Sequence, residues 1–131
     1  MDTALQCLAL VARHHGADIA IDRIKREHAV QEAEVSEQFL IEAAGGAGLE
    51  ARKASLDWNA LSALGDSLPV IARLNNGFSV LVVGIREGEQ GQHVMVLDPL
   101  SEHVELIAVP RHRFEESWSG SVVFVRRDRA A

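Results

Sequence analysis

The spacing of apolar residues changes at Leu49, and this change constrains the fold more than any other feature. Before it, apolar residues recur at helical intervals in three segments, near residues 2–15, 22–28 and 36–47. After it, short alternating or continuous apolar runs separated by turn residues indicate strands. Helices followed by antiparallel strands predict an α+β domain, with the helices packed on one face of a meandering sheet.

The strands are expected over residues 49–54, 70–74, 78–85, 93–97, 104–108 and 121–126. The run FSVLVVGI at 78–85 is apolar almost throughout, which is typical of a strand buried on both faces. Asp57 is suited to cap a short helix, and residues 111–117 are expected to form a helical turn.

The first helical segment contains the only cysteine of the chain, Cys7. Apolar residues cover most of this helix, which is typical of a central buried element, and Gly16 is suited to end it. A catalytic cysteine would need a nearby base and an exposed setting. Cys7 lies among apolar residues, so we expect it to be a core residue.

Composition and motifs exclude several functions. The net charge of −6 argues against a surface that follows nucleic-acid phosphates. A single cysteine excludes an internal disulfide and a thiolate zinc cluster, and the six histidines show no convincing metal-ligand spacing. No phosphate-binding glycine motif is present, and no apolar run approaches the roughly 20 residues that span a bilayer.

Several motifs, taken in order, resemble the double-glycine cysteine peptidases that process bacteriocins. The segment CLALVARHHG at 7–16 is similar to the opening helix of that family, and Ala43-Ala44 with GLEARK at 48–53 is similar to the stretch after its third helix. Further similarities are LPVIA at 68–72, VLDP at 96–99, and the pair Phe114 and Trp118. The resemblance implies a papain-like cysteine peptidase fold over residues 1–127, with 128–131 forming a tail or the start of a linker.

The resemblance also implies which positions would carry the chemistry. The family begins with Asp-Cys-Gly and, after two residues, a second cysteine; with Cys7 as the second cysteine, the nucleophile position falls on Thr3. The histidine position falls on Phe78 or, with a slip of one residue, on Ser79, and the aspartate is Asp98. The oxyanion-hole glutamine would precede the first residue. A threonine without a base is no thiolate nucleophile, so we expect a degenerate peptidase that is not an enzyme.

Domains of this degenerate kind occur at the N-terminus of type I secretion ABC transporters, which export RTX toxins, adhesins and similar proteins. The resemblance implies a non-catalytic domain on the cytoplasmic side of the bacterial inner membrane, part of a polytopic membrane protein. It would recruit the unfolded exported polypeptide, and its partners would be that polypeptide and the rest of the transporter. No cofactor is expected in this domain, because ATP would bind the separate ATPase domain. The candidate substrate contacts are His14, His15, Arg73, Phe78 and Asp98.

Two alternatives stay open at this point. One is an active double-glycine leader peptidase that uses Cys7, which requires a base nearby; His14 lies more than a helical turn away along the chain. The other is a domain that regulates the transporter without binding the exported polypeptide.

Overall fold

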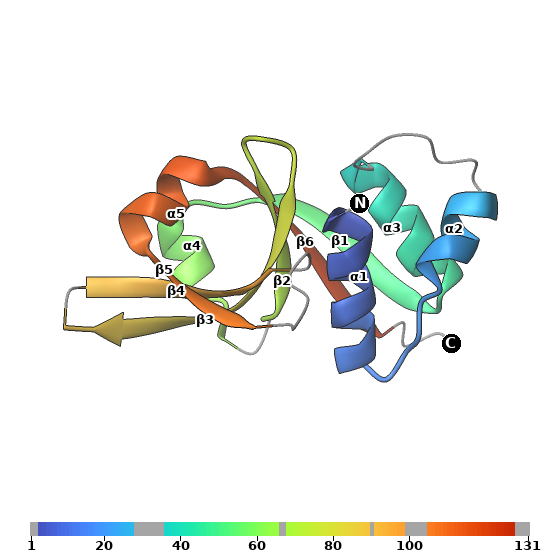
Figure 1. Ribbon diagram of the computed structural model, residues 1–131, viewed down its shortest axis with the longest axis horizontal. Helices are drawn as coiled ribbons and strands as arrows, with labels where there is room; N and C mark the ends of the chain where they lie inside the picture. The colour runs from blue at the N-terminus through green and yellow to red at the C-terminus, as the bar shows by residue number, and fades with distance from the viewer. Residues whose placement is uncertain (1–2, 28–35, 66–67, 90, 99–104, 128–131) are drawn as a thin grey trace.

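A computed structural model describes residues 3–27, 36–65, 68–89, 91–98 and 105–127 (Figure 1). Its helices are α1 (Thr3–His14), α2 (Ile21–Glu27), α3 (Glu37–Gly46), α4 (Trp58–Ser62) and α5 (Arg111–Ser117). Its strands are β1 (Leu49–Ser55), β2 (Val70–Leu74), β3 (Ser79–Gly88), β4 (Gly91–Leu97), β5 (Leu106–Pro110) and β6 (Trp118–Arg127). Each predicted helix and strand is confirmed in type and order, with ends that differ by a few residues. Residues 2, 28, 99, 104 and 128–131, which some predictions include, lie outside the described residues.

Local side-chain chemistry sets where the helices begin and end. The Ser36 hydroxyl accepts a hydrogen bond from the backbone N–H of Phe39 at the start of α3, at 3.1 Å. The Asp57 carboxylate accepts one from Ala60 N at 2.8 Å at the start of α4, as predicted. Gly16 has φ of 79° just after α1, a conformation that glycine adopts without steric cost.

The strands form one sheet in the order β1-β6-β2-β3-β4-β5, and every pair is antiparallel. Only β2 to β5 form a meander, so the prediction of a simple meander is wrong. The last strand, β6, returns to lie between β1 and β2. Its successive residues Val122 and Val123 are both buried, as expected for a central strand that is covered on both faces.

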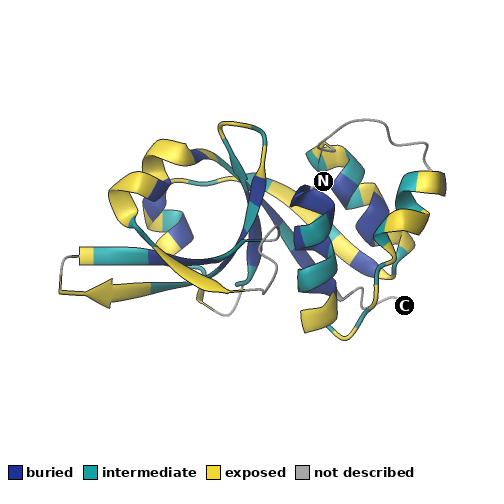
Figure 2. Ribbon diagram, viewed as in Figure 1, coloured by how far each residue is buried: buried dark blue, intermediate teal, exposed yellow. Residues whose placement is uncertain are grey.

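Two separate cores pack against opposite faces of this sheet (Figure 2). On β2, Ile71 belongs to the core that contains α1 and α3, whereas its neighbours Val70 and Ala72 belong to the core that contains Trp58 of α4 and Phe114 of α5. Successive residues of a strand point to opposite faces, so helices cover both faces rather than the one face predicted. Because β2 and β6 are apolar at consecutive positions, both faces of the sheet must be shielded from solvent there.

Helix α1 lies against β2, β3 and β6 and is buried along most of its length (Figure 1; Figure 2). Cys7 is 0% exposed and packs in the same core as Leu8 and Val11, so the prediction that it is a core residue is confirmed. None of the helices in the described residues has the length and apolar character required to span a bilayer.

Candidate functional site

The first residue of α1 contacts the first residue of β3. The Thr3 hydroxyl oxygen Oγ1 accepts a hydrogen bond from the backbone N–H of Ser79 at 2.8 Å, between residues 76 positions apart. Both residues are buried, with Thr3 2% and Ser79 1% exposed. Ser79 Oγ has no hydrogen-bond partner among the described residues, although buried hydroxyls are usually paired. The Thr3–Ser79 contact therefore joins the Thr3 hydroxyl to the Ser79 backbone, in a closed environment.

Of the two positions predicted for the histidine, Ser79 is the one that faces α1. Ser79 lies two residues before Leu81, which packs in the core with α1, and residues two apart on a strand share a face. Phe78 precedes the strand and keeps 46% of its surface exposed. The structure thus brings Thr3 and Ser79 together and leaves the Phe78 side chain outside this contact.

Arg73 and Asp98 lie at the same end of the sheet as Ser79. Arg73 is the partner of Ser79 across the β2–β3 pair, and its Nη1 donates a hydrogen bond to the Gly77 carbonyl oxygen at 2.6 Å. Asp98 directly follows Leu97, which pairs with Leu81 in β3. The backbone of Asp98 is therefore held near the start of β3. The positions that the resemblance assigns to a triad, Thr3, Ser79 and Asp98, gather at one end of the sheet.

The described side chains at this end supply hydroxyls, the Asp98 carboxylate and the Arg73 guanidinium. A hydroxyl becomes a useful nucleophile only when a base takes its proton, usually an imidazole. His14 and His15 lie at the opposite end of α1, roughly 16 Å away for a helix that rises about 1.5 Å per residue. No group of three histidine, cysteine, aspartate or glutamate side chains in the described part of the chain is placed to hold a metal ion.

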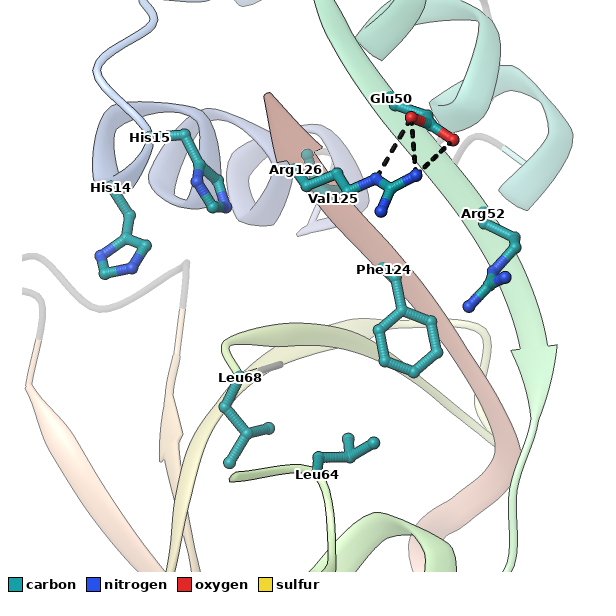
Figure 3. A pocket seen from close by; sticks show the side chains of 9 residues that line it. All are labelled: His14, His15, Glu50, Arg52, Leu64, Leu68, Phe124, Val125 and Arg126. Carbon is teal, nitrogen blue, oxygen red and sulfur yellow. Dashed lines mark hydrogen bonds and ion pairs between the residues drawn. The ribbon is translucent and has the colours of Figure 1, made fainter. Parts of the chain in front are cut away.

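The opposite end of α1 borders a cavity of about 500 Å³, shown in Figure 3 and called here the basic cavity. It is lined by His14, His15, Glu50, Arg52, Leu64, Leu68, Phe124, Val125 and Arg126. Two cross-strand pairs of β1 and β6 form one wall, Glu50 with Arg126 and Arg52 with Phe124. The rings of His14 and His15 meet edge to face, with centroids 5.2 Å apart.

The cross-strand pairs of the basic cavity differ in their electrostatics. Arg126 donates two-pronged hydrogen bonds to the Glu50 carboxylate, from Nε at 3.1 Å and from Nη2 at 3.0 and 3.1 Å. This geometry fixes the orientation of both side chains. The Arg52 guanidinium lies 5.7 Å from the centre of the Phe124 ring, a cation–π distance.

Comparison with known proteins identifies the family. The model of the Peptidase C39 family matches residues 1–130. The chain belongs to the peptidase C39 family. No curated protein sequence matches it.

Solved structures share the fold of this C39 domain at low sequence identity. The N-terminal peptidase C39-like domain of a toxin secretion ATP-binding protein from Vibrio parahaemolyticus matches with a TM-score of 0.80 and 23% identity, over 97% of this chain and 98% of that one. A double glycine motif protease from an AMS/PCAT transporter, solved with its leader peptide, matches with a TM-score of 0.80 and 19% identity, over 96% and 84%. The peptidase domain of Streptococcus ComA matches with a TM-score of 0.77 and 22% identity, over 92% and 88%. The predicted papain-like α+β fold is confirmed.

The structure of this C39 domain does not bring the predicted substrate contacts together. Arg73, Phe78 and Asp98 lie with the Thr3–Ser79 contact, whereas His14 and His15 line the basic cavity. The two groups lie at opposite ends of α1. Thr3 is the first residue of this helix, whereas His14 is the last and His15 comes directly after it.

Sequence reasoning did not single out Arg52, Phe124 or Arg126. Alternation along β1 could have placed Glu50 and Arg52 on one face. Their partners depend on the register between β1 and β6, and Glu50 and Arg126 are 76 positions apart. Phe124, inside an apolar run, resembled an ordinary core residue.

Proposed function

We propose that this C39 domain is non-catalytic and recruits an unfolded exported polypeptide to a type I secretion ABC transporter. The observation that carries the proposal is the Thr3–Ser79 contact. It occupies the place where the family resemblance puts the nucleophile and the base, and it contains neither a thiol nor an imidazole. Loss of a triad nucleophile or base lowers peptidase rates by several orders of magnitude.

The setting of Thr3 supports this proposal. Its oxygen already accepts a hydrogen bond from a backbone N–H, and the residue is 2% exposed. Attack on a peptide carbonyl would require this oxygen to be open to the substrate and next to a base. Cys7, the nucleophile of the alternative peptidase hypothesis, is 0% exposed within the core. Neither side chain is placed to attack a peptide.

The transporter context is also part of the proposal. The similar Vibrio parahaemolyticus domain is the N-terminal domain of a toxin secretion ATP-binding protein, and the similar transporter protease was solved with a leader peptide. By analogy, this chain would lie on the cytoplasmic side of the inner membrane, as part of the transporter, and would bind an RTX toxin or adhesin before export. ATP would bind the transporter's ATPase domain, and this domain would use no cofactor.

The test separates binding from cleavage. The purified chain is titrated with an RTX polypeptide kept unfolded in calcium-free buffer, and binding is measured by calorimetry; the calcium-folded form of the same polypeptide is the control. A double-glycine leader peptide is incubated with the chain in parallel. We expect binding of the unfolded form only, and no cleavage. Specific cleavage after the double glycine would overturn the non-catalytic assignment, and equal binding of the folded form would overturn recruitment of unfolded chains.

A further inference from the structure

The basic cavity gathers two arginines and two histidines in a chain that is acidic overall. His14, His15, Arg52 and Arg126 line it, against the single acidic side chain of Glu50. The whole chain carries a net charge of −6. This local excess of basic groups would favour an anion, because complementary charge directs a ligand to a site.

Within the cavity, the arginines are not equivalent. Arg126 is held by the two-pronged contact with Glu50. Arg52 forms no ion pair among the described residues, and its contact is with the face of Phe124. An arginine over an aromatic ring keeps the N–H donors in the plane of its guanidinium available to a carboxylate. Arg52 is therefore the group that a bound anion would reach.

The rest of the cavity is apolar. Leu64, Leu68 and Phe124 line it, and all three pack against the core on the α4 face of the sheet (Figure 3). A volume of about 500 Å³ falls in the range of about 300–1,000 Å³ that is usual for ligand sites. Such a site has room for an apolar side chain beside the anionic group.

We propose that the basic cavity binds an acidic segment of a polypeptide in which a carboxylate side chain stands next to a large apolar side chain. The carboxylate would contact Arg52, and the apolar side chain would lie on Phe124 and Leu64. This inference rests on the proposed function, because it places the segment on the recruited polypeptide. It assigns recognition to the His14 end of α1, away from the Thr3–Ser79 contact.

The test uses short peptides and the whole chain. A capped peptide containing Leu-Asp-Phe is titrated into the labelled protein, with Leu-Asn-Phe and Ser-Asp-Ser peptides as controls for charge and for apolar contact. Binding is followed by NMR shifts of the Arg52 and Phe124 amides. We expect the Asn and Ser peptides to bind at least fivefold more weakly. Equal binding of all three would overturn the proposal, as would equal competition by inorganic phosphate, which would indicate a general anion site.

A variant pair locates the site. Arg52→Gln is expected to lower the affinity for the Leu-Asp-Phe peptide about tenfold, the usual loss when a charged hydrogen bond is removed. Arg86→Gln, which removes an exposed arginine of β3 that does not line the cavity, is the matched control and should change nothing. Unchanged binding to Arg52→Gln would overturn the assignment of the cavity.

The outcomes separate this inference from the proposed function. If the unfolded RTX polypeptide binds equally well to wild type and to Arg52→Gln, recruitment stands and the cavity assignment fails. If the short acidic peptide binds through Arg52 but the unfolded polypeptide does not bind, the cavity assignment stands and recruitment fails.

Discussion

The two ends of α1 differ in almost every physical respect, although one helix joins them. At the Thr3 end, two hydroxyl residues are buried, and the Thr3 hydroxyl accepts a hydrogen bond from the Ser79 backbone N–H. At the His14 end, an open cavity holds four basic side chains, one carboxylate and an apolar surface. The papain-like fold is present, while the Thr3–Ser79 contact, at the end that the resemblance assigns to catalysis, contains neither a thiol nor an imidazole. Because one fold can carry different functions, function has to be argued from each site.

The largest expected effect concerns the thiol between the two ends. Cys7 is 0% exposed, so a thiol reagent can react with it only when the core opens. We expect labelling of the native protein to be at least about 1,000-fold slower than labelling in denaturant, as for a domain of ordinary stability. The measurement is the rate of reaction with a chromogenic disulfide. Rapid labelling of the native protein would instead support the alternative in which Cys7 is a reactive nucleophile.

The next effect tests the Thr3–Ser79 contact directly. Thr3→Val keeps the shape of the side chain but removes the acceptor of the Ser79 N–H, leaving that buried group unpaired. We expect a loss of about 1–3 kcal/mol in the free energy of unfolding, measured by urea denaturation. Thr3→Ser, which keeps the hydroxyl, should lose less. Peptide binding at the basic cavity should stay unchanged in both variants, and a parallel loss there would mean that the two ends are coupled.

Ser79→Ala is expected to act in the opposite direction. Ser79 Oγ is buried and has no partner among the described residues, so its removal relieves an unfavourable desolvation. We expect the free energy of unfolding to rise, or to stay within about 1 kcal/mol of the wild type. A clear loss of stability on urea denaturation would indicate that this hydroxyl has a polar partner in solution.

The smallest effect belongs to the Glu50–Arg126 pair of the basic cavity. Both side chains are more than half exposed, at 51% and 66%, so solvent screens their attraction. A double-mutant cycle with Glu50→Gln and Arg126→Gln should give a coupling free energy below about 1 kcal/mol, decreasing with added salt. A coupling well above that value would show that this pair is part of the stability of the sheet rather than a feature of the cavity alone.

Local features of the fold could be predicted from the sequence, and long-range ones could not. The caps at Ser36 and Asp57 and the burial of Cys7 follow from neighbouring residues, and the structure has them. The position of β6 between β1 and β2 does not, because strand pairing joins distant segments. The packing of helices on both faces of the sheet could not be predicted either, because it too depends on contacts between distant segments.

In the candidate site, too, local features could be predicted from the sequence and long-range contacts could not. The sequence placed the histidine position on Phe78 or Ser79 and could not choose, because a slip of one residue in a turn reverses which side chain faces the helix. The structure places Ser79, rather than Phe78, against Thr3. The basic cavity was not predicted, because its wall exists only when the register of β1 and β6 sets Arg52 opposite Phe124.

The place of β6 in the sheet has a consequence for the timing of synthesis. This strand pairs with both β1 and β2, and its valines complete both cores, Val123 in one and Val122 in the other. A ribosome that has made residues 3–117 has therefore produced helices and strands that lack their central partner. Until β6 emerges, the apolar face of α1 has no complete surface to pack on, and such nascent chains are prone to aggregation. Protection by a chaperone at that stage would matter more for this domain than for one whose strands pair in the order they are made.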